Sequence, residues 1–181
     1  MDQKTDSEIV ARILEGDVQA YAQLVDAYKS PIYNLAFQMT GSLSDAEDLT
    51  QEIFIRAYQK LYQFDRGKKY FTWLYTIGIN LIRNHLKKKS KDVLNHTVAP
   101  FSTESQRTEK ESREDDFLSE NSMKRLDENM QKLPVDLREA IILKFLHDMT
   151  FEEVAAITGN SVSAVKMRVY RGLEKLKALM D

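Results

Sequence analysis

The sequence of 181 residues contains no cysteine, only three prolines and six glycines, and no apolar run long enough to cross a membrane. The absence of cysteine excludes disulfide staples, thiol catalysis, iron–sulfur clusters and cysteine zinc sites. A membrane helix needs roughly 18 or more apolar residues. Residues 1–6 have neither the basic flank nor the apolar run of a secretory signal. We therefore expect a cytoplasmic protein with no membrane insertion.

Charges of opposite sign are sorted along the chain. Residues 66–91 carry eight Lys and Arg and no acid, and residues 160–181 carry five basic residues against two acids. By contrast, residues 1–65 hold eleven acids against five basic residues, and residues 92–131 hold ten against five. Two basic segments separated by acidic chain predict two contacts with a polyanion. The alternative is a set of solvated helix faces, and for the C-terminal segment alone this is the better explanation.

Helix-forming residues dominate, and apolar residues recur every three or four positions, so we expect an all-α fold. Residues 1–91 should form one helical bundle, in which Ser44 and Glu47 make a capping box at the start of a long helix. Residues 92–121 are rich in Ser, Thr, Glu and Asp and cannot build a core, so they are interpreted as an acidic flexible linker. Residues 122–181 should form a second domain.

The C-terminal residues 150–177 have the pattern of a helix-turn-helix. Thr150 and Glu153 make a capping box for a short helix, the turn spans residues 158–160, and Ser161 caps a second helix. The second helix is expected to pack inward through Val165, Val169, Leu173 and Leu176, and to face outward with Ser163, Lys166, Met167, Tyr170 and Arg171. Such a helix fits the major groove of DNA, and the alternative is an ordinary amphipathic hairpin.

Asp136 is expected to cap the helix before this motif, which should run to about His147. Its apolar residues spread around most of its circumference. Either one side of the helix meets a partner protein, or the whole helix is buried within the small domain.

An acidic helix face is predicted in residues 45–54. Leu49 and Ile53 point to the core, and the opposite face carries Asp45, Asp48, Gln51 and Glu52. This face suits a basic helical partner, although a solvated acidic surface has the same pattern.

Residues 64–75 interleave cations with aromatic rings. Cations bind phosphates, rings stack on bases at roughly 1–3 kcal/mol each, and a side-chain amide can hydrogen-bond an extruded base. Trp73 is in phase with core residues and is assigned to packing. The candidates for contact with unstacked nucleic acid are Asp65, Arg66, Lys68, Lys69, Tyr70, Tyr75, Asn80, Arg83, Asn84 and Lys87.

No catalytic or metal site is predicted. His85, His96 and His147 have no metal-ligand spacing, there is no glycine-rich phosphate loop, and the carboxylates of residues 45–52 have a structural explanation. We expect no enzymatic activity, no cofactor and no metal.

Taken together, residues 45–56, 71–80 and 150–171 resemble a bacterial sigma factor of the extracytoplasmic-function (ECF) group, the minimal type with only its second and fourth conserved regions. The resemblance implies an all-α protein with region 2 in residues 1–91 and region 4 in residues 122–181. It also implies that the chain binds core RNA polymerase and directs promoter-specific initiation of transcription.

The resemblance assigns roles residue by residue. Asp48, Gln51 and Glu52 match the helix that docks on the clamp helices of the polymerase β′ subunit. The loop 65–70 and Asn80 match the element that captures a flipped base of the minus-ten region, with Arg83 and Lys87 beside it for duplex or backbone contacts. The helix that contacts the minus-35 element carries Lys166, Arg168, Tyr170 and Arg171, and its small domain would also bind the β flap.

Two alternatives accompany this resemblance. Many similar proteins are bound by an anti-sigma factor, which is therefore a candidate partner. The competing hypothesis is a self-sufficient helix-turn-helix regulator with an N-terminal sensing or dimerisation bundle, which would bind duplex DNA without polymerase.

Overall fold

The computed structural model describes residues 3–95 and 124–180, and within these ranges every regular element is a helix. This confirms the predicted all-α fold. The N-terminal half contains α1 (Gln3–Leu14), the short 3₁₀ turn η1 (Val18–Ala20), α2 (Tyr21–Thr40), α3 (Leu43–Gln59), a second turn η2 (Leu61–Gln63) and α4 (Tyr70–Asn95). The C-terminal half contains a helix over residues 124–132, α6 (Val135–Ile141), a π-helical turn η3 (Ile142–Leu146), α7 (Phe151–Thr158) and α8 (Val162–Met180).

The turn between α2 and α3 fixes where the acidic helix begins. Gly41 ends α2 with a φ of +68°, in the left-handed region that glycine adopts easily. Ser42 follows in an extended conformation, and its side chain accepts a hydrogen bond from the N–H of Asp45. The predicted capping box of Ser44 and Glu47 is wrong, because the left-handed glycine places the cap two residues earlier.

The core of the N-terminal half lies between α2, α3 and α4. Leu24, Ile32 and Leu35 of α2 are fully buried, as is Ile53 of α3. Gly78 of α4 lies so close to α3 that an added Cβ would lie 3.4 Å from Cδ1 of Ile53. Close packing of this kind holds α4 rigidly along the other two helices.

Capping residues set the ends of the C-terminal helices. Thr150 and Glu153 form the predicted capping box, and Gly159 ends α7 with a φ of +69°. The hydroxyl of Ser161 accepts a hydrogen bond from the N–H of Ala164, as expected for a cap of α8. Asp136, expected to cap the next helix, lies inside its first turn instead, because α6 starts at Val135 after Pro134, and its α-helical part ends at Ile141.

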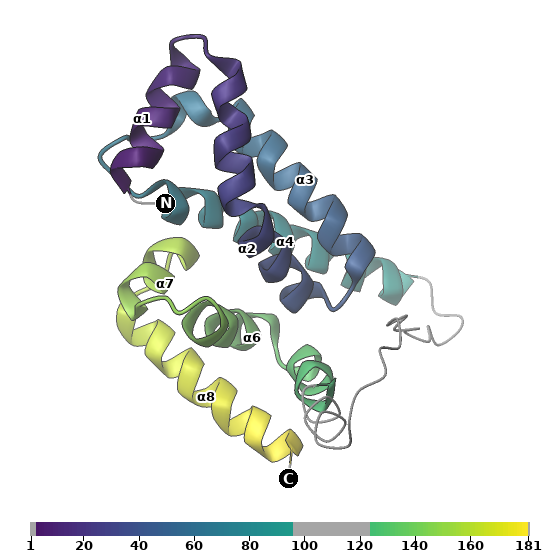
Figure 1. Ribbon diagram of the computed structural model, residues 1–181. Coiled ribbons are helices and arrows are strands. Elements are labelled where there is room, and N and C mark those ends of the chain that lie inside the picture. The colour runs from purple at the N-terminus through teal and green to yellow at the C-terminus, as the bar shows by residue number, and fades with distance from the viewer. Residues whose placement is uncertain (1–2, 96–123, 181) are drawn as a thin grey trace, which may run out of the picture.

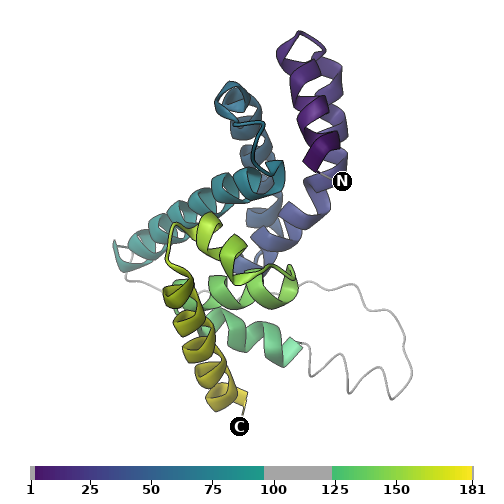
Figure 2. The same ribbon diagram turned by 90° about the vertical axis from the view of Figure 1, so that its left-hand side faces the viewer.

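The two halves pack against each other. Helix α7 lies along α4, while α6 and η3 contact α2, and Figures 1 and 2 show α7 directly beside α4 in both views. Helix α4 continues to Asn95, so residues 92–95 of the predicted linker are helical. The rest of that linker, residues 96–121, lies outside the described residues.

Candidate nucleic-acid interface

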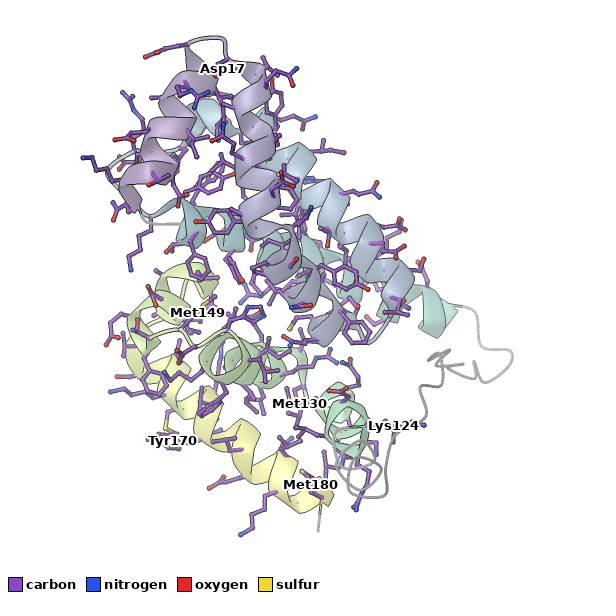
Figure 3. The ribbon with its side chains drawn as sticks, viewed as in Figure 1. Asp17, Lys124, Met130, Met149, Tyr170 and Met180 are labelled. Atoms are coloured by element: carbon purple, nitrogen blue, oxygen red, sulfur yellow. The ribbon has the colours of Figure 1, made fainter. Side chains whose placement is uncertain are left out.

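Helix α8 presents a polar face to solvent. Figure 3 shows Tyr170 on the side of α8 that points away from α6, and this side chain is 60% exposed. Arg168 is half-buried, with its Nε 3.6 Å from Oδ2 of Asp136. The outward orientation predicted from sequence is confirmed for the five exposed side chains Ser163, Lys166, Met167, Tyr170 and Arg171.

The buried face of α8 differs from the prediction at one position. Leu173 was expected to pack inward but is 37% exposed. The buried residue of that turn is Gly172, where an added Cβ would lie only 2.7 Å from Cδ1 of Ile141. The buried face of α8 therefore consists of Val165, Val169, Gly172 and Leu176, whose spacing follows the helical repeat of 3.6 residues.

The ammonium group of Lys166 lies over an aromatic ring of α7, the short helix that precedes α8. Nζ of Lys166 lies 5.5 Å from the centroid of the Phe151 ring, and Lys144 lies 5.3 Å from the same centroid. Cations over an aromatic face are attracted to it by about 0.5–1 kcal/mol at exposed sites. Two cations are thus held next to the exposed face of the helix-turn-helix.

The second cationic surface lies on α4 and on the loop before it. All four polar loop candidates, Asp65, Arg66, Lys68 and Lys69, are exposed, as are Asn80, Asn84 and Lys87 on α4. Helix α1 supports the loop, because the Gln3 amide donates to the Gly67 carbonyl at 3.1 Å and the Ser7 hydroxyl to the Arg66 carbonyl at 3.0 Å. The loop therefore has a defined conformation.

The expected contact roles of two tyrosines do not fit this structure. Tyr70 and Tyr75 are 0% and 1% exposed, so neither ring is available for stacking on a base. The Tyr70 ring lies 5.5 Å from that of Phe64 and 5.6 Å from that of Trp73. Trp73, predicted to pack inward, is partly buried and packs against the core, so its assignment to packing is confirmed. Tyr70 is buried because α4 begins at this residue, which directs Tyr70 and Leu74 into the core.

The acidic face of α3 is smaller than predicted. Asp48 and Gln51 are exposed, and Glu52 is partly exposed and pairs with Arg56 at 2.6 Å. Asp45 instead faces α4, where its carboxylate lies 2.7 Å from Nζ of Lys89. Burial acts to raise the pKa of Asp45, but the hydrogen bond and the charge of Lys89 outweigh it and lower the pKa overall. Asp45 is therefore already paired within the chain.

A shallow groove runs beside this acidic face. It lies between α2 and α3 and encloses about 400 Å³. Its lining residues are Lys29, Ser30, Tyr33, Asn34, Glu47, Thr50 and Gln51. Because Gln51 belongs to both the groove and the acidic face, one partner could contact the two together.

Contacts between the two halves involve three of the candidate nucleic-acid residues. Arg83 of α4 forms two hydrogen bonds with the Glu139 carboxylate, at 2.6 and 2.7 Å. Lys69 lies 2.8 Å from Oε1 of Glu153, and Tyr75 hydrogen-bonds to His147 at 2.9 Å. Sequence reasoning missed all three pairs, because the partners are 56 to 84 residues apart along the chain.

The His147 ring is held neutral between two polar side chains. Its Nε2 lies 3.1 Å from Oε1 of Gln38, which can only accept, so Nε2 carries the proton and Nδ1 accepts from the Tyr75 hydroxyl. Burial lowers the pKa of His147 from 6.5 to about 4. The imidazole is thus uncharged at neutral pH.

This lowered pKa predicts a loss of stability in acid. The unfolded chain binds a proton at His147 near pH 6.5, whereas the folded chain does so only near pH 4. The contribution of the neutral ring to folding is present above pH 6.5 and is lost as the pH falls towards 4. We expect His147→Gln to flatten the pH dependence of the unfolding free energy between these values, as measured by urea titration. If the unfolding free energies of the variant and the parent changed equally with pH, the assignment of this acid sensitivity to His147 would be contradicted.

The geometry of the described residues defines a class of protein. A helix-turn-helix carries an exposed cationic helix, and a helical bundle in the N-terminal half carries a cationic stripe and a small acidic face. Such a pair of surfaces on one chain is typical of a nucleic-acid-binding protein with two contact regions. Within the described ranges no helix is long and apolar enough to span a membrane.

Comparison with known proteins identifies the family. The model of sigma-70 region 2 matches residues 24–92, and that of sigma-70 region 4 matches residues 123–176. The chain is 35% identical to the ECF RNA polymerase sigma factor SigW of Bacillus subtilis over 175 residues, which cover 93% of this chain and 92% of the relative. It is 33% identical to the ECF RNA polymerase sigma-E factor of Escherichia coli, covering 97% and 94%. The chain belongs to the sigma-70 family of RNA polymerase sigma factors, in its ECF group.

Solved structures show the same fold. CnrH in complex with the cytosolic domain of CnrY is 27% identical to this chain with a TM-score of 0.71, and the match covers 99% of this chain and 98% of CnrH. The sigma factor RpoE of Bartonella quintana, in complex with the anti-sigma factor NepR, is 25% identical with a TM-score of 0.72, covering 88% and 96%. Both of these relatives were solved bound to another protein.

Proposed function

We propose that this protein binds core RNA polymerase in the cytoplasm and directs it to promoters. The observation that carries the proposal is that regions 2 and 4 of the sigma-70 family occur on one chain, each with an exposed cationic surface. The protein itself breaks no covalent bond in this account. It acts by binding separated DNA strands more strongly than intact duplex, which offsets a cost of a few kcal/mol for each flipped base.

Docking on polymerase is assigned to α3. Asp48, Gln51 and Glu52 lie on one exposed edge of this helix, beside the groove between α2 and α3. Their charge suits a basic helical partner, for which the resemblance supplies the β′ clamp helices. Asp45 is left out of this docking surface, because Lys89 already neutralises it.

Recognition and melting of the minus-ten region are assigned to α4 and the loop 65–69. The exposed amide of Asn80 is the candidate to hydrogen-bond a flipped base, and Asn84 and Lys87 continue the same stripe. The exposed loop cations Arg66 and Lys68 are the candidates to contact phosphates, joined by Lys69 where its pairing with Glu153 is released. Tyr70 serves the packing of α4 rather than the contact, and Tyr75 contacts His147 of the C-terminal half.

The Asn80 assignment predicts a defect in promoter opening. We expect Asn80→Ala to reduce permanganate reactivity of minus-ten thymines in the holoenzyme by about tenfold, since a lost base contact is worth about 1–3 kcal/mol. Affinity for core polymerase should stay unchanged, because Asn80 lies on α4 and the docking surface on α3. Ser90→Ala, on the exposed end of the same helix, is the control. An equal loss of polymerase binding in Asn80→Ala would contradict the assignment.

Binding to the minus-35 element is assigned to α8. We expect Arg171→Ala to weaken the upstream footprint of the holoenzyme by roughly tenfold, because Arg171 is exposed on the cationic face and each good base contact contributes about 1–3 kcal/mol. Lys177→Ala, near the end of α8, removes the same charge outside the predicted contact and should leave the footprint intact. Unchanged protection in Arg171→Ala would refute the role of this face.

An anti-sigma factor is the further partner we propose for this chain. The support is the similarity to RpoE, which was solved with the anti-sigma factor NepR. The cationic stripe of α4 and the acidic face of α3 are the surfaces that such a partner could cover.

A further inference from the structure

Side chains of α1 bind the exposed loop 65–69 that precedes α4. The Gln3 amide donates to the Gly67 carbonyl at 3.1 Å, and the Ser7 hydroxyl donates to the Arg66 carbonyl at 3.0 Å. Figure 1 shows the loop passing beside the N-terminal end of α1. Gln3 and Ser7 are four residues apart and therefore lie on the same face of the helix. Two successive peptide groups of the loop are thus bound to one face of α1.

Helix α1 is itself fixed to the core of the N-terminal half. Its buried face includes three apolar residues, Ile9, Val10 and Ile13. The buried carboxylate of Asp6 accepts a hydrogen bond from the Tyr28 hydroxyl of α2 at 2.6 Å. Asp6 lies between Gln3 and Ser7 along the chain, so this bond anchors the turn of α1 that binds the loop. The loop is therefore bound to a rigid support.

The two ends of the loop are buried, whereas its middle is exposed. Phe64 and Tyr70 flank the loop, and their rings lie 5.5 Å apart in the core. Residues 65–69 between them are all exposed. Within the loop, the Asp65 carboxylate accepts a hydrogen bond from the Gly67 N–H at 2.9 Å. This bond shapes the loop locally, and the bonds from α1 fix the position of the loop against the bundle.

Fixing the loop affects how strongly it can bind an extruded base. A loop that already has its binding conformation loses less conformational freedom when the ligand arrives. If only a fraction of the molecules has the competent conformation, the apparent affinity falls by that fraction. Two hydrogen bonds of ordinary net strength can change this fraction about tenfold. Loss of the bonds from Gln3 and Ser7 should therefore weaken base binding without removing any group that contacts DNA.

We propose that Gln3 and Ser7 are positioning residues for base capture: they keep the loop 65–69 in the conformation that accepts an extruded base, and they contact no DNA themselves. Helix α1 ends at Leu14, before residue 24, where the match to sigma-70 region 2 begins. The inference rests on the proposed function for what the loop binds. The support that α1 gives to the loop is tested separately in the free chain.

Proteolysis of the free full-length chain tests whether α1 supports the loop. Trypsin cleaves after Arg and Lys, the loop carries three such residues, and cleavage follows the population in which the loop has opened locally. We expect Gln3→Ala combined with Ser7→Ala to speed cleavage within the loop about tenfold, with the fragments identified by mass spectrometry. Alanine is the most favourable helix residue, so α1 should stay folded. An unchanged cleavage rate would overturn the proposal.

The matched control is Lys4→Ala combined with Glu8→Ala. Both residues are exposed and lie four positions apart on α1, and in the part of the chain that the structure describes neither side chain bonds to the loop. Both double variants leave the net charge unchanged. The control should be cleaved within the loop at the rate of the parent. Equal acceleration in the two double variants would show a general loosening of α1 and would count against the proposal.

Reconstituted holoenzyme tests the consequence for base capture. The probe is the fluorescently labelled non-template strand of a promoter that the parent holoenzyme transcribes, and an abasic site at each minus-ten position in turn identifies the captured base. We expect the double variant of Gln3 and Ser7 to bind the intact strand about tenfold more weakly than the parent, and the abasic strand equally well. The upstream footprint, the affinity for core polymerase and the urea midpoint should not change. Ser7→Thr, which keeps the hydroxyl, should bind like the parent.

The abasic strand separates positioning from a merely structural role. Equal weakening on the intact and abasic strands, or a lowered urea midpoint in place of the specific loss, would refute the positioning role. If the double variant does not fold, Ser7→Ala alone removes one of the two bonds and should show about a threefold loss on the intact strand only. A parent holoenzyme that neither binds the strand nor transcribes would remove the proposed function, and proteolysis of the free chain would still decide whether α1 supports the loop.

Discussion

Replacing Tyr70 with alanine is expected to lower the free energy of unfolding of the N-terminal half by about 3–5 kcal/mol, the usual range for removing a large buried aromatic ring. Tyr70 is 0% exposed, and its ring contacts those of Tyr28, Phe64 and Trp73 at centroid distances of 5.5 to 5.6 Å. The measurement is urea unfolding followed by the fluorescence of Trp73, which is the only tryptophan of the chain.

The control for this prediction is Tyr170→Ala. Tyr170 is 60% exposed on α8, so its loss should change the unfolding free energy by no more than about 0.5 kcal/mol. If Tyr70→Ala were as mild as Tyr170→Ala, the assignment of Tyr70 to the core rather than to nucleic-acid contact would fail.

Reversing the charge of the α3 face should have the second largest effect. We expect Asp48→Lys combined with Glu52→Lys to weaken binding to core polymerase by about 100-fold or more, because like charges placed across an interface cost several kcal/mol. Asp48 is exposed and Glu52 is partly exposed, so neither substitution buries a charge. Fluorescence anisotropy with labelled protein and purified core enzyme measures the affinity.

The matched control is Glu8→Lys in comparison with Asp48→Lys. Glu8 is exposed on α1 and lies outside both the acidic face of α3 and the groove beside it, so it carries the same charge change away from the docking surface. Equal losses for the two single variants would show a general effect of net charge and would contradict the docking assignment.

The helix-turn-helix could be predicted from sequence because local chemistry determines it. The capping box of Thr150 and Glu153, the left-handed Gly159 and the cap at Ser161 act within a few residues of one another. The prediction that Leu173 is buried is wrong, because the sequence pattern does not indicate that a glycine takes the buried position in that turn. Gly172 takes this position, and its lack of a side chain permits close packing on Ile141.

The arrangement of α4 could not be predicted in the same way. The burial of Tyr70 depends on the residue at which the helix starts, and no capping signal in the sequence marks that residue. The pairing of Arg83 with Glu139 joins residues 56 positions apart, which no local pattern reveals. Sequence reasoning therefore found the cationic stripe but not the carboxylates that cover it.

Specific promoter recognition by this chain is expected to require core polymerase. A gel-shift assay tests this on promoter fragments selected by transcription of a genomic library, with the protein alone and with added core enzyme. We expect a specific complex and permanganate-reactive thymines only when core enzyme is present. Tight, sequence-specific binding of intact duplex by the isolated chain would contradict it and would favour a self-sufficient regulator.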